Sequence, residues 1–123
     1  MSDFNYYNAN TDGREEEDCV TRAISLATKI SYNGISRLLD MIASYYGCQK
    51  LNCGCYGRLL TDIFGFPVRY GEDAETVEDI AKKYKYNTLL IRIDGHLTTS
   101  IAGVIFDIWD CSKKIVDKYW IIT

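Results

Sequence analysis

The order of two residue patterns constrains the fold of this chain more than any other feature. Between residues 18 and 85, apolar residues recur at helical spacing, whereas residues 88–122 consist of β-branched and aromatic runs separated by turn signals. Helices followed by antiparallel strands are typical of an α+β domain. We therefore expect a single domain over residues 1–123, in which N-terminal helices pack on a C-terminal antiparallel β-sheet.

Four helices are expected in the first part of the chain, at residues 18–29, 32–46, 59–64 and 76–85. Asp18 is a suitable N-cap for the first helix, and Gly47 is a suitable residue to end the second. Thr76 and Asp79 resemble a capping box in which Asp replaces Glu. Residues 47–57 are rich in glycine and cysteine, so they are expected to form a connection between helices.

The second part predicts four strands, at Thr88–Ile93, Leu97–Ala102, Val104–Trp109 and Ile115–Ile122. His96, the only histidine, stands at the start of the second strand, and Cys19 opens the first helix. A thiol attacks only as thiolate, and a helix N-terminus lowers its pKa. An adjacent imidazole takes the thiol proton and later returns it, while a third group fixes the imidazole tautomer. These residue types predict a thiol nucleophile.

The hairpin register decides which carboxylate accompanies His96. If Ala102-Gly103 is a two-residue turn, Thr98 faces Asp107, and Asp107 lies on the His96 face one diagonal step away. Asp110 then falls on the opposite face. A bulge or a three-residue turn would shift the register by one residue and select Asp110 instead. We therefore expect Asp107 as the third group and keep Asp110 as the alternative.

These elements resemble the papain-like cysteine peptidase superfamily, and in particular short bacterial and phage proteins with similar motifs. The matching segments are Asp18–Ile24, Gly95–Leu97 and Asp107–Asp110. In papain-like enzymes an Asn-x-Trp element follows the histidine. Its Asn orients the imidazole, and its Trp shields that hydrogen bond from water. The resemblance covers residues 15–122 and implies a papain-like fold, with Asp107 in place of the Asn and Trp109 as the shielding residue.

The activity that the resemblance implies is hydrolysis of a peptide or isopeptide bond in a peptide or protein substrate. Cys19 would be the nucleophile, His96 the general base and then acid, and Asp107 the group that orients His96. The same thioester chemistry also serves acyl transfer and deamidation. A further alternative is a catalytically silent phage or bacterial protein of this fold that binds a host partner.

Papain-like enzymes usually carry a Gln about six residues before the cysteine as one oxyanion donor. Position 13 here is Gly, and the only glutamine is Gln49. Asn8 and Asn10 are therefore the candidate donors, together with the backbone N–H of Cys19. Four consecutive acidic residues, 15–18, precede the nucleophile and oppose thiolate formation. Three alternatives follow for these four residues: their side chains point to solvent, they lower the activity of the site, or they favour a substrate with a basic segment.

The bulk properties exclude several classes of protein. A net charge of -3 and a pI of about 5.1 disfavour a broad nucleic-acid-binding face. Lys82–Tyr86 interleaves bases with aromatics, but cations at a helix C-terminus are expected there in any case. No apolar run is long enough for a membrane helix, and residues 1–7 do not resemble a signal peptide. A cytoplasmic protein, in a bacterium or a phage-infected host cell, is expected.

Five cysteines are present, and in such a compartment they are expected to be reduced. Cys48, Cys53 and Cys55, with Cys111, offer four thiolates to a zinc ion. Their spacing differs from the usual zinc-binding pattern, and no second histidine is available to replace one of them. We therefore expect a reduced, half-buried loop, with no metal ion and no cofactor.

Overall fold

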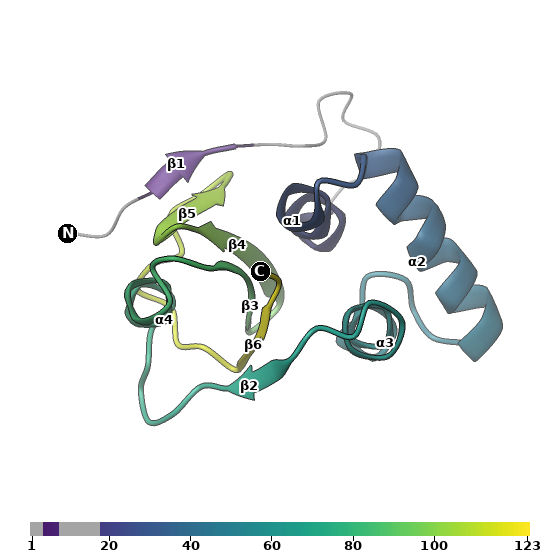
Figure 1. Cartoon of the computed structure of the whole chain (residues 1–123). Helices are drawn as coiled ribbons and strands as arrows, with labels where there is room; N and C mark the ends of the chain where they lie inside the picture. Colours follow the sequence, from purple (N-terminus) through teal and green to yellow (C-terminus); the bar gives the residue numbers. More distant parts are fainter. Residues whose placement is uncertain (1–3, 8–17) are drawn as a thin grey trace.

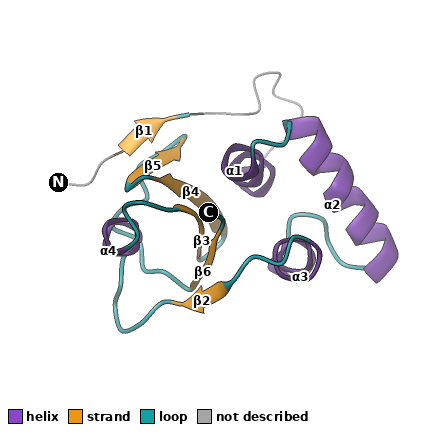
Figure 2. Cartoon of the chain, viewed as in Figure 1, coloured by secondary structure: helices purple, strands orange, loops and turns teal. Residues whose placement is uncertain are grey.

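Among the residues that the structure describes, helices occupy most of the first half of the chain, and four of the six strands follow residue 87. The structure, a computed structural model, describes residues 4–7 and 18–123 (Figures 1 and 2). The helices are α1 (Cys19–Thr28), α2 (Tyr32–Tyr46), α3 (Cys53–Arg58) and α4 (Val77–Lys83), and a π-helical turn, η1 (Leu59–Ile63), continues α3. The strands are β1 (Phe4–Tyr6), β2 (Val68–Tyr70), β3 (Thr88–Ile93), β4 (His96–Ile101), β5 (Val104–Asp107) and β6 (Lys118–Ile121). The described chain is thus of the mixed α+β class.

The six strands form one mixed sheet in the order β1-β5-β4-β3-β6-β2. Five of them pair antiparallel with their neighbours, whereas β1 lies parallel to β5. The expectation of an entirely antiparallel sheet is therefore wrong at this edge. A three-residue strand within a polar segment carries no alternation that sequence reading can detect.

Alternation along β3 gives the sheet two apolar faces. Leu90 belongs to a buried cluster with residues of α1, α2, α3 and η1, whereas Leu89 and Ile91 belong to a cluster with residues of α4. Figure 1 shows α1 and α3 beside one face of the sheet, α2 outside them, and α4 beside the other face. Trp120 of β6 is fully buried in the first cluster, and its indole N–H donates to the Thr61 hydroxyl at 2.9 Å. Burial on both faces explains why three consecutive residues of β3, Leu89–Ile91, are apolar.

The helix ends follow the predicted local chemistry in two of three places. Gly47 adopts the left-handed conformation, with φ of 69°, at the C-terminus of α2. Thr76 and Asp79 form the predicted capping box at α4. At the third, Asp18 occupies the N-cap position of α1 but its side chain makes no capping hydrogen bond. The predicted connection over 47–57 is wrong in part because α3 begins at Cys53. Two glycines hide the periodicity of α3, and the π-helical turn then shifts its register by one residue.

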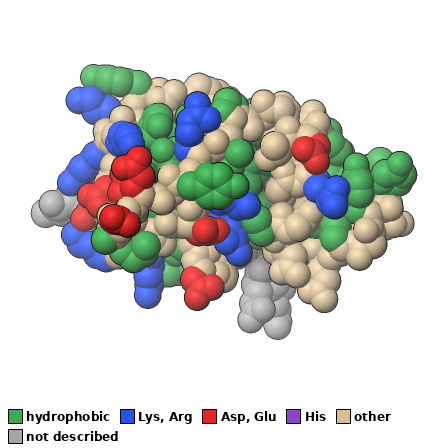
Figure 3. All heavy atoms as spheres, turned by 90° about the horizontal axis from the view of Figure 1, so that it is seen from below, with side chains coloured by type: hydrophobic (Ala, Val, Ile, Leu, Met, Phe, Trp, Pro, Cys, Tyr) green, Lys and Arg blue, Asp and Glu red, His purple; other side chains and the backbone are tan. Residues whose placement is uncertain are grey.

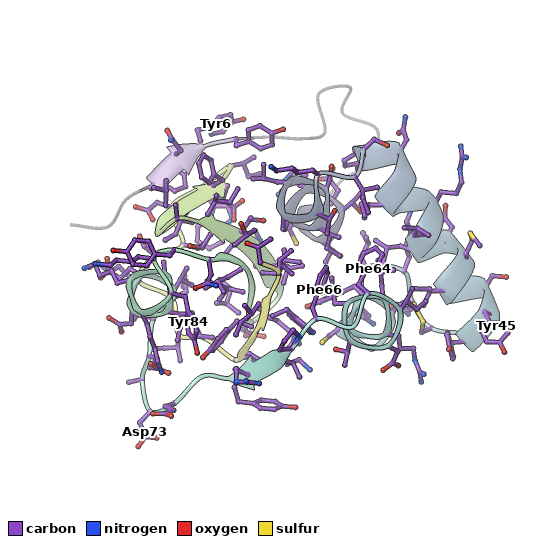
Figure 4. The ribbon with its side chains drawn as sticks, viewed as in Figure 1. Tyr6, Tyr45, Phe64, Phe66, Asp73 and Tyr84 are labelled. Atoms are coloured by element: carbon purple, nitrogen blue, oxygen red, sulfur yellow. A yellow bond between two sulfur atoms is a disulfide. The ribbon has the colours of Figure 1, made fainter. Side chains whose placement is uncertain are left out.

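The sheet ends differ from the prediction more than its centre does. β3 has the predicted bounds, but β5 stops at Asp107 and β6 begins only at Lys118. Ile115 makes an isolated bridge with Thr76, so this part of the predicted strand connects α4 with the sheet. The short edge strand β2 was not predicted. Next to it, where the chain leaves η1, the rings of Phe64 and Phe66 pack with centroids 5.5 Å apart (Figure 4).

The β4–β5 hairpin has the predicted two-residue turn. Ile101 pairs with Val104, and the φ values of Ala102 and Gly103 are 52° and 81°. Positive φ at both turn residues defines the type I′ turn, whose twist matches that of the flanking strands. The register inferred from this turn, with Asp107 on the His96 side of the hairpin, is confirmed.

The left-handed conformation of Ala102 is a stability cost that can be removed. Asparagine tolerates this conformation better than alanine and is preferred at the first position of a type I′ turn. We expect Ala102→Asn to raise the free energy of unfolding by about 1 kcal/mol, measured by urea denaturation. Ala102→Val, which adds a β-branched side chain at the same φ, is the opposed control and should destabilise. Equal midpoints for all three proteins would contradict the assigned turn.

One pair of cysteines is joined covalently. Cys48 and Cys55 form a disulfide across a separation of seven residues, whereas Cys19, Cys53 and Cys111 are free. The prediction that all five are reduced is therefore wrong for this pair, and the two sulfurs are not available to a zinc ion. Sequence spacing alone does not reveal such a bond, because the turn at residues 50–52 brings the two backbones together. Among the described residues, no helix is long and apolar enough to cross a membrane.

Candidate functional site

Cys19 is positioned by the docking of α1 on the sheet. It is the first residue of α1, and four α1 positions, Val20, Ala23, Ile24 and Ala27, bury their side chains in the cluster on the sheet. The Thr99 hydroxyl of β4 donates to the Ala23 carbonyl at 2.8 Å, and both groups are buried. This contact ties the middle of α1 to the middle of β4. The half-buried Cys19 thiol therefore lies at the beginning of β4, hydrogen-bonded to His96 and to the backbone of Leu97.

His96 is held by Asp107 across the hairpin. Its Nε2 lies 2.6 Å from Oδ2 of Asp107, and the two side chains are 9% and 5% exposed. The other carboxylate oxygen of Asp107 accepts the Ile108 amide at 2.7 Å. Since a carboxylate only accepts, Nε2 carries the proton of this bond, which leaves the other ring nitrogen for exchange with the thiol. Carboxylate, imidazole and thiol thus form one connected chain of hydrogen bonds.

Trp109 and Asp110 have different places around this chain. The Trp109 ring lies over His96, with centroids 4.9 Å apart and an interplanar angle of 46°, and is 39% exposed. It stands between the imidazole and solvent, where the resemblance places the shielding residue. Asp110 is exposed and accepts the amide of Ser112 at 3.0 Å through Oδ1. The structure therefore brings Asp107, and not Asp110, to His96.

The electrostatics of the pair favour a charged thiolate. Burial alone raises the pKa of Cys19, but the hydrogen bonds from His96 and Leu97 and the charges of His96 and Arg22 lower it below its ordinary value. Burial likewise opposes the charged form of His96, but hydrogen bonds to Asp107, Cys111 and Cys19 raise its pKa to about 11. With a pKa of about 11, the imidazole carries its proton at neutral pH.

Asp18 is placed differently from its predicted role. It occupies the N-cap position of α1 but makes no capping hydrogen bond with its side chain. Its carboxylate, 1% exposed, is instead ion-paired with Arg22 and accepts the Tyr32 hydroxyl at 2.6 Å. Arg22, the cation near the Cys19 thiol, therefore neutralises Asp18, the acidic residue that directly precedes Cys19. Residues 15–17 of the acidic run, and the oxyanion candidates Asn8 and Asn10, lie outside the described residues.

An open cleft of about 750 Å³ begins at the Cys19 side of the pair. Cys19 and Arg22 line it from α1, and His96 and Trp109 line it from the hairpin. The opposite wall comes from the loop before α3 and from α3 itself, at residues 49 to 56. The Cys48–Cys55 disulfide closes this segment into a ring. A peptide-sized group can therefore reach the sulfur from the side that His96 leaves open.

Cys111 is a buried neighbour that the sequence did not single out for this site. Its Sγ lies 3.9 Å from Oδ2 of Asp107. With His96 it completes a group of nitrogen, oxygen and sulfur donors that lie within 4.8 Å of one another. Zinc accepts this donor set, so these three residues could hold a metal ion if the His96–Asp107 hydrogen bond opened.

Two cleft residues, Arg92 and Tyr56, also escaped sequence reasoning. Arg92 interrupts the apolar run of β3 between Ile91 and Ile93, and a lone charge within a buried strand is a signal that sequence reading could have used. Tyr56 gave no signal of this kind because it is one of ten tyrosines. Comparison of the chain with protein-family models, curated proteins and solved structures gave no significant match.

Proposed function

We propose that this chain is a cysteine peptidase with a papain-like fold, which hydrolyses peptide or isopeptide bonds. The observation that carries the proposal is the position of the His96 imidazole, between the Asp107 carboxylate and the Cys19 thiol, at the edge of an open cleft. In this proposal Cys19 is the nucleophile, His96 exchanges the proton, and Asp107 holds the imidazole. The proposed setting is the cytoplasm of a bacterium or a phage-infected cell.

The chemical sequence has two halves. The Cys19 thiolate attacks the scissile carbonyl carbon, and His96 donates its proton to the leaving amine as the tetrahedral intermediate collapses to a thioester. Water then attacks the thioester and gives one proton to His96, which releases the carboxylic acid and restores the Cys19 thiolate beside the protonated imidazole. The Cys19 amide is among the first N–H groups of α1, which have no carbonyl partner within the helix, so it is suited to the developing oxyanion.

The fate of the thioester distinguishes hydrolysis from its alternatives. We expect a library of unmodified peptides and isopeptide-linked peptides to yield cleavage products with one water added, identified by mass spectrometry. Ligated products would indicate acyl transfer, and conversion of Gln to Glu without chain cleavage would indicate deamidation. Each outcome requires the thiol of Cys19, so the same library incubated with Cys19→Ala is the control.

A catalytically silent, partner-binding protein is the second candidate. It is favoured by an exposed apolar surface near the C-terminal end of α2, made of Met41, Tyr45, Tyr46 and Ile63. Figure 3 shows apolar side chains gathered at this end of the molecule, and Figure 4 shows Tyr45 pointing away from α2. Exposed aromatic patches mark interaction surfaces. Unchanged peptides together with an unreactive Cys19 would favour this candidate.

A further inference from the structure

Apart from the Cys19–His96 pair, the charged side chains that line the cleft are both cations among the described residues. Two guanidinium groups, those of Arg22 and Arg92, line it, and no Asp or Glu of residues 4–7 and 18–123 does so. The thiolate of Cys19 and the imidazole of His96 carry opposite charges and offset each other. Clefts lined by one sign of charge concentrate ligands of the opposite sign. The described walls therefore favour an anionic ligand, in contrast to the basic segment considered from the acidic run before Cys19.

Arg92 is the more accessible of the two cations. On β3 it alternates with Ile91 and Ile93, whose side chains enter the cluster on the α4 side, so its own side chain leaves the sheet on the cleft side. Its side chain is 31% exposed, whereas that of Arg22 is 11% exposed and paired with the buried Asp18. Arg92 is thus the cation that an incoming group can reach.

The contacts of Arg92 fix its guanidinium without enclosing it. Its Nη1 is ion-paired with Asp117, which is 48% exposed and does not line the cleft. Tyr56, a buried residue of α3 that also lines the cleft, lies close enough to Arg92 and to Cys53 for both to affect its pKa. A guanidinium carries five N–H donors, and its planar edge matches a carboxylate. The Asp117 carboxylate holds the Arg92 guanidinium from outside the cleft. The N–H groups on the edge toward the cleft can donate hydrogen bonds to a second carboxylate.

We propose that Arg92 is a specificity-determining residue that binds a carboxylate of the peptide substrate close to the scissile bond. The inference rests on the proposed function. The carboxylate belongs to an Asp or Glu side chain or to the chain terminus, and both sources offer the same bidentate partner.

The first test compares two alkylating reagents of similar size, iodoacetate and iodoacetamide. With both, the Cys19 thiolate attacks the methylene carbon and iodide leaves, but only iodoacetate carries a carboxylate. Rates at Cys19 are read by peptide mass mapping, which separates this thiol from Cys53 and Cys111. We expect Arg92→Gln to lower the ratio of iodoacetate rate to iodoacetamide rate about three- to tenfold at low salt, and less at high salt.

Two further variants separate charge from structural damage. Arg69→Gln removes the same charge from an exposed residue of β2 outside the cleft and should leave the ratio unchanged. Asp117→Asn removes the outer partner of Arg92 and should raise the ratio, which general destabilisation would not do. An Arg92→Gln ratio equal to that of the unmodified protein, with Cys19 still reactive, would overturn this inference alone. A Cys19 that reacts with neither reagent would instead overturn the proposed function.

Peptide protection identifies the source of the carboxylate. Peptides with Glu or Gln, each with a free or amidated C-terminus, are added before iodoacetamide, and protection of Cys19 is measured. Protection that depends on Glu indicates a side-chain carboxylate, and protection that depends on the free terminus indicates a terminal one. In either case the protection should be lost in Arg92→Gln and retained in Arg92→Lys to a lesser degree. Equal protection by all four peptides would contradict the proposal.

Discussion

Replacement of Cys19 by alanine is expected to abolish both covalent labelling by a thiol-directed acyl probe and turnover of any peptide substrate. The reason is that no other thiol is hydrogen-bonded to His96 on the open side of the cleft. Removal of a nucleophile from a concerted unit costs the full benefit of that unit, so a loss of at least about 10⁴-fold is expected. Labelling is measured by intact-protein mass, and turnover by product formation.

Three other cysteine variants serve as controls for this experiment: one removes a free thiol, and two remove the disulfide. Cys53→Ser removes the other free thiol that lines the cleft, and Cys48→Ser and Cys55→Ser remove the disulfide. All three should retain labelling at Cys19, since none of them touches His96. Cys19 is half-buried at a helix start, so its truncation should leave the thermal midpoint nearly unchanged. Equal labelling of Cys19→Ala and the unmodified protein would end the hypothesis.

The second large effect is expected at Asp107, where two substitutions separate orientation from charge. Asp107→Ala removes the acceptor for Nε2 and should lower turnover about 10²- to 10⁴-fold, the usual contribution of an oriented acid–base group. Asp107→Asn keeps an acceptor oxygen in nearly the same place but removes the charge. Because the Nε2–H of His96 keeps an acceptor, this variant should retain far more activity than Asp107→Ala.

Both variants should lower the pKa of His96, which is about 11 in the unmodified protein. Since this is the only histidine, its ring protons give a single, unambiguous NMR titration. The folded pKa lies above the ordinary value of 6.5, so protonated His96, paired with the Asp107 carboxylate, stabilises the fold fully below that pH, and this contribution is lost as pH rises through about 11. The stability deficit of Asp107→Asn should therefore be largest in weakly acidic to neutral solution, where the Asp107 carboxylate is charged, and should shrink on the alkaline side.

Comparing Asp107→Asn with the unmodified protein isolates the contribution of the His96–Asp107 charge interaction to the pH dependence of stability. The pKa of Cys19 is lowered, so its contribution to the pH dependence has the opposite sign. It is present in both proteins and cancels to a large extent in the difference between them. Urea denaturation at several pH values measures that difference. A deficit independent of pH, with an unshifted His96 titration, would contradict the charge interaction with Asp107.

The part of the site that sequence could predict is the part governed by short-range rules. The period of two along a strand, together with the two-residue turn at Ala102-Gly103, is sufficient to choose Asp107 over Asp110. Cys19 at the start of α1 follows from helical periodicity. The predictions for Asp107 and Cys19 both rest on patterns contained within a few neighbouring residues.

The part that sequence could not predict depends on contacts between distant segments. The cleft wall at residues 49–56 takes its place through the Cys48–Cys55 disulfide and the packing of Tyr56 against Trp120. Arg92 lines a cleft only because α3 lies opposite β3. The hydrogen bond from the Tyr32 hydroxyl to Asp18 likewise depends on α2 returning beside α1, whereas the Asp18–Arg22 ion pair joins residues only four apart.

The His96–Asp107 contact joins residues only eleven positions apart, whereas the contact between Cys19 and His96 joins residues separated by more than half of the chain. The hairpin therefore assembles its acid–base pair through local contacts, which form with little loss of chain entropy. The thiol joins that pair only when α1 docks on β4, and this is the longest-range contact in the site. Reactivity of Cys19 during refolding would then report the arrival of α1, and a chain that has formed its sheet but not docked this helix would carry the base without the nucleophile.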